Sequence, residues 1–245
     1  MKAVLFDVHG TLVVKGPREA LDAAQNAIVD YLSRHGFAVT LERYRQALAD
    51  NAKRFRRDVE ELNEVGFYQW YECLLADLGI PLQDRDWIDR LNEEFGRASA
   101  ATAHPMPHAL EVLSQLRRAY RLGVVSNSMA PNTRRDLAVA GLADAFDSVV
   151  ISTDVGKRKP HPYIFNLALA NLGVTAEEAV FVGDHPIEDI AGAKRVGMKA
   201  ILIQSPSRAD TRWSELRRGD SALPPAEPDA TIEDLAELPD AIARV

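Results

Sequence analysis

The sequence contains a single cysteine, Cys73, and lacks any long apolar run. One thiol cannot form a disulfide or a cysteine metal site within the chain, so a reducing compartment is expected. At the N-terminus, Asp7 interrupts the apolar run before it reaches the length of a signal-peptide core, and no other stretch reaches the roughly 20 residues of a membrane span. We therefore expect a cytoplasmic protein without a membrane segment.

The chain also lacks an excess of basic residues. It has 29 Lys and Arg against 36 Asp and Glu, which gives a formal net charge of −7 at pH 7. Affinity for nucleic acid rests on clustered Lys and Arg, and the basic clusters here, such as residues 53–57, are short. We expect a small-molecule partner rather than nucleic acid, and the sequence leaves both a monomer and a homodimer open.

What the chain does contain is a series of short apolar runs bounded by turn residues. Such runs are typical of parallel strands buried on both faces, and helical patterns separate them. Alternating strands and helices predict a doubly wound α/β sheet with a Rossmann-like core. The expected strands are 3–7, 122–128, 146–152, 179–184, 199–204 and a weaker one at 229–232, and the expected helices are 109–120, 133–140, 163–172 and 187–196.

One long interval breaks this alternation. Between residues 16 and 100 the sequence shows amphipathic helical patterns and no convincing strand, which indicates a helical insertion after the first strand. Prolines at 105 and 107 then return the chain to the core, because proline blocks continuation of a helix. Residues 205–228 are rich in Ser, Pro, Arg and Asp and predict a surface excursion with a short helix around 213–217. Within the insertion, helices are expected near 20–32, 41–58, 64–79 and 84–98.

Chemically active side chains follow the predicted strands. In an open parallel sheet, ligands bind at the carboxyl ends of the strands, where the connecting loops converge. The residues that this rule brings together are Asp7, His9, Ser126, Asn127, Lys159, Asp184 and Asp189.

Four strings in this set resemble, in order, the four motifs of the haloacid-dehalogenase-like (HAD) hydrolase superfamily. They are FDVHGTL at 6–12, VVSNS at 124–128, VGKRKPHPYIF at 155–165 and VGDHPIEDIAGA at 182–193. The resemblance implies a core of residues 1–15 and 101–245 with a mobile helical cap at 16–100. It also implies a hydrolase, most simply a Mg²⁺-dependent phosphatase of a small phosphomonoester.

The resemblance assigns a role to each residue of the set. Asp7 would be the nucleophile and form an aspartyl-phosphate, which divides one difficult displacement into two easier steps. Lys159 would neutralise Asp7 and the transferring oxygens. Thr11, Ser126 and Asn127 would bind the substrate.

The same resemblance predicts a metal site. Mg²⁺ prefers one or two carboxylates together with water and phosphate oxygens, and Asp7 and Asp184 would supply them, with the main-chain carbonyl of His9 as a further ligand. Mn²⁺ or another divalent metal is an alternative. Asp189 would either support Asp184 and Lys159 or favour the start of a helix.

Position 9 departs from the family pattern. Phosphatases of this family carry a second Asp two residues after the nucleophile, whereas this chain has His9. An imidazole can donate and accept a proton near neutrality, so His9 could serve as the general acid and base. The opposite reading is that proton transfer is impaired. Two further imidazoles in the motifs, His161 and His185, leave a transition-metal site open, because imidazole suits Zn, Mn or Ni better than Mg.

Three rival functions remain open. A metal-free 2-haloacid dehalogenase fits His9 and the Ser126-Asn127 pair, but Asp184 would repel its carboxylate substrate. A C–P hydrolase would use a cap lysine, for which Lys53 is the candidate. The third is a binding protein that has lost catalysis. Substrate-specificity candidates in or beside the cap, chosen by polarity alone, are Lys15, Arg54, Arg57 and Tyr68.

Overall fold

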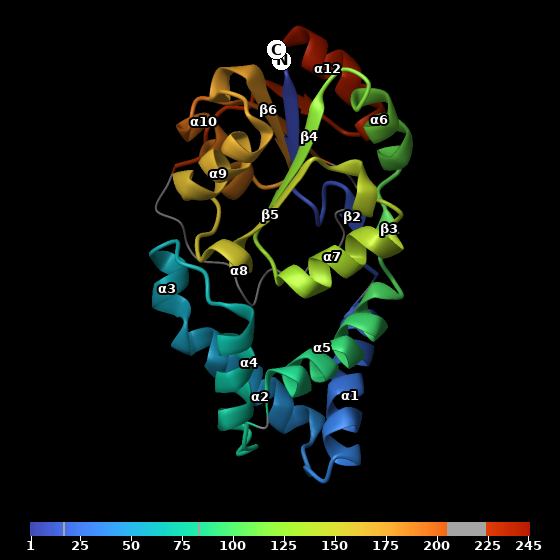
Figure 1. Cartoon of the computed structure of the whole chain (residues 1–245), viewed down its shortest axis with the longest axis vertical. Coiled ribbons are helices and arrows are strands. Elements are labelled where there is room, and N and C mark those ends of the chain that lie inside the picture. Colours follow the sequence, from blue (N-terminus) through green and yellow to red (C-terminus); the bar gives the residue numbers. More distant parts are fainter. Residues whose placement is uncertain (17, 83, 205–223) are drawn as a thin grey trace.

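A six-stranded parallel sheet forms the centre of the α/β core (Figure 1). The computed structural model describes residues 1–16, 18–82, 84–204 and 224–245. The strand order is β5-β4-β1-β6-β7-β8, so the first strand lies between strands that come much later in the chain. All six expected strands are confirmed, as β1 (Ala3–Phe6), β4 (Arg121–Ser126), β5 (Ser148–Ile151), β6 (Ala179–Gly183), β7 (Lys199–Ile203) and β8 (Ala230–Ile232).

Both faces of the sheet are covered by helices, which explains the continuous apolar runs. Successive side chains of a strand point to opposite faces, and in β1 Val4 and Phe6 join one apolar cluster while Ala3 and Leu5 join another. The first cluster includes side chains of α6 (Ala109–Leu116), α7 (Ala130–Val139) and α12 (Leu238–Arg244), and the second those of α9 (Pro162–Leu172) and α10 (Gly192–Arg195).

The interval without predicted strands forms a helical insertion with its own apolar core, at the end of the molecule opposite the two termini (Figure 1). Two of its helices begin at side-chain caps: Thr40 accepts a hydrogen bond from the Arg43 N–H, and Asp84 from the Trp87 N–H. Its five helices are α1 (Arg18–Arg34), α2 (Leu41–Arg54), α3 (Arg56–Glu60), α4 (Phe67–Asp77) and α5 (Arg85–Ala100).

Several predicted boundaries were wrong. The single helix expected at 41–58 is divided at Phe55, which leaves helical geometry and buries its ring 6.0 Å from that of Trp70. The helix expected at 187–196 is a π-helical segment, η3 (Pro186–Ala191), followed by the short α10. The expected helix around 213–217 lies outside the described residues.

The described residues of the insertion contact the core at several places. Its two connections to the core run through a short antiparallel ribbon that was not predicted, β2 (Val13–Val14) with β3 (His104–Pro105). Helix α5 packs on α7, where the Asn92 side chain donates to the Asn132 side chain at 3.0 Å. The loop before α4 contacts the loop after α8 (Ser152–Val155), where the Glu64 N–H donates to the Gly156 carbonyl at 3.1 Å.

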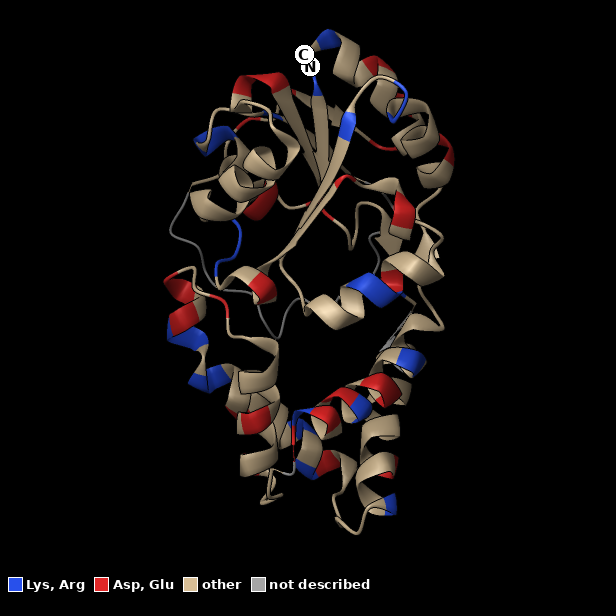
Figure 2. Cartoon of the chain, viewed as in Figure 1, with Lys and Arg blue, Asp and Glu red and all other residues tan. Residues whose placement is uncertain are grey.

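Acidic and basic residues are interspersed along both parts of the chain (Figure 2). Within the insertion many of them pair with each other, for example Arg54 with Asp77 at 2.6 Å. Among the described residues, no helix is both long and apolar enough to cross a membrane.

Candidate active site

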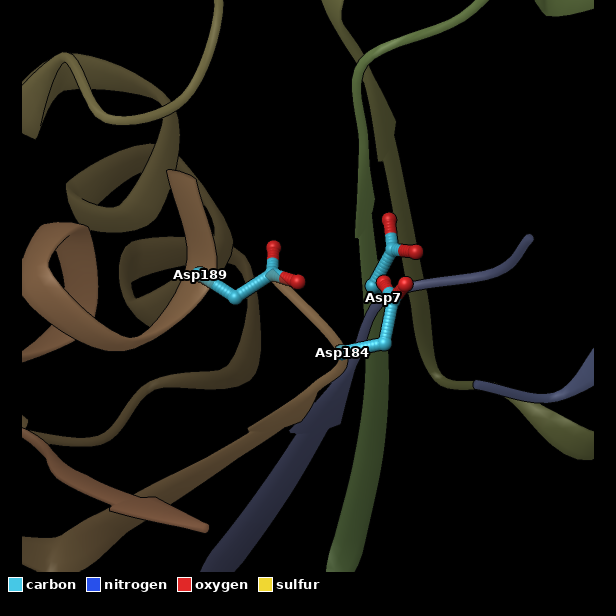
Figure 3. A group of neighbouring side chains, drawn as sticks. All are labelled: Asp7, Asp184 and Asp189. Atoms are coloured by element: carbon cyan, nitrogen blue, oxygen red, sulfur yellow. The ribbon is translucent and has the colours of Figure 1, made fainter. Parts of the chain in front are cut away.

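Three carboxylates gather at the carboxyl ends of β1 and β6 (Figure 3). Asp7 directly follows β1, Asp184 directly follows β6, and Asp189 extends from η3. An oxygen from each lies within 4.8 Å of those from the other two. Asp7 and Asp189 are buried and Asp184 is partly buried. The fold thus brings together three of the acids that the sequence singled out.

Two glycines make this close approach possible. Gly10 has a positive φ of 92°, and a Cβ there would lie 2.8 Å from Oδ2 of Asp184. A Cβ at Gly183 would lie 2.4 Å from the side chain of Asp189. Larger residues at either position would therefore displace an acid of the cluster.

Lys159 lies between two of the acids. Its Nζ donates to Asp7 Oδ1 at 2.7 Å and to Asp189 Oδ1 at 2.6 Å, and the side chain is 1% exposed. Burial alone would lower the pKa of Lys159, but the two carboxylates raise it above its ordinary value, so the ammonium stays charged. Burial raises the pKa of Asp7, and the charge of Lys159 opposes that rise.

Asn127 makes a different contact from the expected one. Its side chain donates to the Lys159 carbonyl at 2.9 Å and accepts from the Lys159 N–H at 2.7 Å. Both ends of the amide therefore hold the main chain of Lys159, although Asn127 also borders the cavity described below.

The other two residues with expected substrate-binding roles differ in their access to the site. The Ser126 side chain lies at the end of β4, borders the cavity and accepts a hydrogen bond from Ser128 at 3.1 Å. Thr11 does not border that cavity: it is fully buried, and its hydroxyl has no hydrogen-bond partner among the described residues. Its polar side chain is close in sequence to the nucleophile, which suggests access to the substrate, but Thr11 is buried in the turn that begins at Val8.

His9 belongs to a network that the sequence did not reveal. Its Nε2 lies 2.9 Å from Oδ2 of the buried Asp136 on α7, and the same oxygen pairs with Lys15 at 2.7 Å. Lys15 also donates to Ser99 on α5 at 2.9 Å. Burial alone would raise the pKa of Asp136, but the hydrogen bond from His9 and the charge of Lys15 lower it below its ordinary value.

A signal for Asp136 was present in the sequence. Helix 133–140 was predicted from its apolar pattern, and Asp136 stands on the same face as Thr133, Leu137 and Ala140. A carboxylate on a buried face needs a partner, because an unpaired buried charge is costly. That argument could have found Asp136, although not its partner His9, which is 127 positions away.

A cavity of about 230 Å³ opens onto the carboxylates and extends to the helical insertion. Its core end includes Asp7, Ser126, Lys159 and Asp184. Of the polarity-based specificity candidates, Lys15 borders the cavity. Arg54, Arg57 and Tyr68 do not; these three contact Asp77, Glu61 and Asp89 instead.

The donor set of the cluster suits a hard divalent cation. Its members are carboxylates, and three of them against the single ammonium of Lys159 leave an excess of negative charge that a cation would balance. The imidazoles of the motifs have other contacts. The Nδ1 atom of His185 accepts the N–H groups of Ile187 and Glu188, and that of His161 accepts the Tyr163 N–H. Oxygen ligands favour Mg²⁺ or Mn²⁺ over softer metals.

Comparison with known proteins decides the family. Residues 1–197 match the family described as haloacid dehalogenase-like hydrolase, and residues 157–238 match a second HAD-hydrolase-like family description. This chain belongs to the haloacid dehalogenase-like hydrolases. The resemblance drawn from the four motifs is thereby confirmed, and the protein is a hydrolase.

Similar proteins include both phosphatases and a dehalogenase. This HAD-like hydrolase is 31% identical over 245 residues to a glyceraldehyde 3-phosphate phosphatase of Methanopyrus kandleri, covering 99% of this chain and 97% of the relative. A HAD phosphatase of Thermococcus onnurineus has a similar structure, with a TM-score of 0.66, 29% identity and full coverage of both chains. A 2-haloacid dehalogenase of Pseudomonas syringae has a TM-score of 0.67 and 28% identity, with 100% and 99% coverage.

Proposed function

We propose that this HAD-like hydrolase is a divalent-metal-dependent phosphatase of a small phosphomonoester, with Asp7 as the nucleophile. The observation that carries the proposal is the position of Asp7, which contacts the buried Lys159 and lies in one cluster with Asp184. The relative from Methanopyrus kandleri, named as a phosphatase, supports the same reaction class.

The reaction needs two displacements at phosphorus. In the first, a carboxylate oxygen of Asp7 attacks the phosphorus, the bond to the ester oxygen breaks, and the alcohol leaves with a proton. In the second, water attacks the same phosphorus, the bond to Asp7 breaks, and inorganic phosphate and the free carboxylate result. Lys159 lies 2.7 Å from Asp7 and stabilises the negative charge that both steps carry.

Asp7 and Asp184 would hold Mg²⁺, together with the main-chain carbonyl of His9. When bound, the cation supplies positive charge next to the phosphoryl oxygens, which lets a carboxylate approach a phosphate dianion. Asp189 acts through its neighbours: it holds Lys159 at 2.6 Å and accepts the His185 N–H at 2.9 Å, which fixes the loop after Asp184.

His9 is placed to move the proton in both displacements. It borders the cavity, its side chain is 26% exposed, and the buried Asp136 holds its Nε2. An imidazole anchored by a carboxylate keeps a defined orientation. In this arrangement His9 donates to the leaving alcohol oxygen and later accepts from the attacking water.

The helical insertion acts as a cap, residues 16–100, over a core of residues 1–15 and 101–245. It supplies one wall of the cavity and joins the core through the β2–β3 ribbon. Closure of such a unit excludes water from the charged end of the site and strengthens the electrostatic contacts there. Its open and closed positions would therefore control access of the substrate.

A dehalogenase is the second candidate, because the Pseudomonas syringae dehalogenase covers the whole chain at 28% identity. Its substrate would be a carboxylate, and Asp7, Asp184 and Asp189, which outnumber the ammonium of Lys159, would repel that substrate unless a metal cation were present. The three-carboxylate cluster therefore favours the phosphatase.

Isotope labelling separates the two reactions. With one equivalent of substrate in H₂¹⁸O, a phosphatase places ¹⁸O in inorganic phosphate, because water attacks phosphorus, and the Asp7 peptide keeps its mass. Dehalogenation through an Asp7 ester places ¹⁸O in the carboxylate of Asp7, because water attacks the carbonyl carbon. Labelled phosphate from p-nitrophenyl phosphate supports the proposal; labelled Asp7 with a haloacid and no phosphate release rejects it.

A further inference from the structure

The cavity changes chemistry along its length. The core end contains the carboxylates and Lys159, whereas the wall from the helical insertion is built largely from apolar side chains. Trp70 and Leu74 come from α4, and each is at least nine-tenths buried. Leu21, Leu48 and Phe95 complete this wall from α1, α2 and α5.

Among the described residues of the insertion, those that line the cavity carry no formal charge at neutral pH. Its polar members are Gln25, Tyr44 and Tyr71. The side-chain carbonyl of Gln25 accepts a hydrogen bond from the Arg45 side chain at 2.8 Å. The Tyr71 hydroxyl donates one to the Asn92 side chain at 2.8 Å. Burial raises the pKa of Tyr44, so its phenol stays neutral. This wall can contact a neutral group but offers no charge to an ionic one.

The cations that line the rest of the cavity already lie opposite carboxylates. Lys15 and Lys159 form the ion pairs described above. Arg158 lies 3.7 Å from Glu64 and 3.6 Å from Glu188, and these two carboxylates offset its charge, although its Nη1 has no hydrogen-bond partner among the described residues. A second anionic group on a substrate would lose its hydration here without gaining a cation of its own.

We propose that the phosphomonoester split at this site carries an uncharged, apolar alcohol, such as an aryl-bearing or branched alkyl group, and no second phosphate or carboxylate. The inference rests on the proposed function and names its substrate class. The phosphate contacts the charged core end, and the alcohol contacts the insertion wall at Trp70, Leu74 and Phe95. Burial of apolar area against this wall selects the substrate.

Three primary alkyl phosphates test the proposal without large differences in leaving-group chemistry. They are 2-phenylethyl phosphate, glycerol 3-phosphate and 3-phosphopropanoate, the last being the phosphate ester of 3-hydroxypropanoate. We expect kcat/KM to be highest for the phenylethyl ester, at least about tenfold above glycerol phosphate and about a hundredfold above 3-phosphopropanoate. Equal values, or a preference for the polyol or the carboxylate, would overturn it.

A charge placed on the wall should change this preference. Leu48 borders the cavity and is partly exposed, so Leu48→Lys introduces an ammonium without opening a void in the core. The ratio of kcat/KM for 3-phosphopropanoate to that for the phenylethyl ester should rise at least about tenfold. The matched control is Leu82→Lys, whose side chain is 48% exposed and does not border the cavity; it should leave the ratio unchanged. An unchanged ratio in Leu48→Lys contradicts the proposal.

Binding of non-hydrolysable phosphonates separates this inference from the proposed function. Calorimetry with the wild-type protein and Mg²⁺ should show tighter binding of 3-phenylpropylphosphonate than of 3-carboxypropylphosphonate, again by at least about tenfold. If no ester releases phosphate, the proposed function fails, yet the order of phosphonate binding still decides whether the cavity selects an apolar group. The reverse order of binding rejects the inference even if phosphate is released.

Discussion

At the scale of single residues, His9 shows how one substitution in a motif is accommodated by its surroundings. Its Nε2 lies 2.9 Å from Asp136, whose carboxylate is buried and also pairs with Lys15. This carboxylate partner fixes the orientation of the imidazole, as the proposed proton transfer requires.

Replacing His9 should therefore reduce turnover more than substrate binding. For His9→Ala we expect kcat for an alkyl ester such as 2-phenylethyl phosphate, whose alcohol must leave with a proton, to fall about 10²- to 10⁴-fold, the usual contribution of a positioned acid or base. KM should change little, because the phosphate contacts lie on Lys159 and the metal site. Asp136→Asn should lower kcat in the same direction by a smaller factor.

The control for this pair is His108→Ala, because His108 has a side chain that is 48% exposed and does not border the cavity. It should keep the wild-type kcat. Wild-type turnover in His9→Ala would show that His9 has no part in proton transfer.

The candidate site could be predicted from the sequence only in part. Five residues of the site lie at the end of a strand or in the segment after it, and the carboxyl ends of parallel strands lie at one edge of the sheet. They are Asp7, Ser126, Lys159, Asp184 and Asp189. Asn127 contacts a loop 32 positions away in the sequence. His9 contacts a helix 127 positions away. No local pattern encodes such distances.

At the scale of elements, the loop before α4 holds the insertion against the loop that carries Lys159. Glu64 is buried, its Oε2 accepts from the Ser152 hydroxyl at 2.7 Å, and it lies 3.7 Å from Arg158. Asn63 accepts from Lys157 at 2.5 Å in the same contact. The position of the insertion is thereby coupled to that of the loop that carries Lys159.

Removing the charge of Glu64 should loosen this contact. We expect Glu64→Gln to lower the free energy of unfolding by roughly 1–3 kcal/mol, because the buried guanidinium of Arg158 loses one of its two carboxylate partners. Glu64→Gln should also raise KM, since the contact that holds the insertion against the core becomes weaker. Urea titration and steady-state kinetics measure the two effects. The control is Glu61→Gln, because the ion pair of Glu61 with Arg57 is exposed. Its free energy of unfolding should stay within about 0.5 kcal/mol of that of the wild type. Equal stability of Glu64→Gln and Glu61→Gln would contradict the coupling.

A second prediction at this scale concerns the edge of the sheet. Asp229 precedes β8 and accepts from Lys194 at 2.8 Å and from the Ala200 N–H at 2.8 Å. Burial alone would raise the pKa of Asp229, but these donors lower it below its ordinary value. Its stabilising effect is therefore fully present above the pKa of the unfolded chain and is lost as the pH falls through the folded value.

Asp229→Asn should accordingly be less stable than wild type by about 1 kcal/mol at neutral pH. The difference should shrink as the pH falls below about 4, the ordinary range of an Asp carboxyl. Urea titrations across pH 3 to 7 measure it, with the exposed Asp240→Asn as control. A difference that stays constant with pH would show that the ionised form of Asp229 is not what stabilises the edge.

At the scale of the whole molecule, the two parts of the fold were predictable for different reasons. Strands buried on both faces appear as continuous apolar runs, and all six expected strands are present. The interval 16–100 was recognisable by helical periodicity alone. The β2–β3 ribbon was not, because two-residue strands leave no pattern, and neither was the apolar wall of the cavity, which four separate helices build.

The cavity is thus divided into a charged core end and an apolar wall. In the proposed reaction, the core end performs the chemistry through Asp7 and Lys159, and the insertion selects the alcohol. Asp7 is central to this proposal, because without it the cavity would bind a phosphate ester and leave it intact.

The most direct test measures phosphate release from p-nitrophenyl phosphate by the wild type and by Asp7→Asn, with Mg²⁺ and with chelator. We expect metal-dependent release by the wild type and a loss of at least about 10⁴-fold in Asp7→Asn, since a nucleophile has no substitute in the site. Asp240→Asn should match the wild type. Metal-dependent release that Asp7→Asn retains at the wild-type rate would show that Asp7 is not the nucleophile.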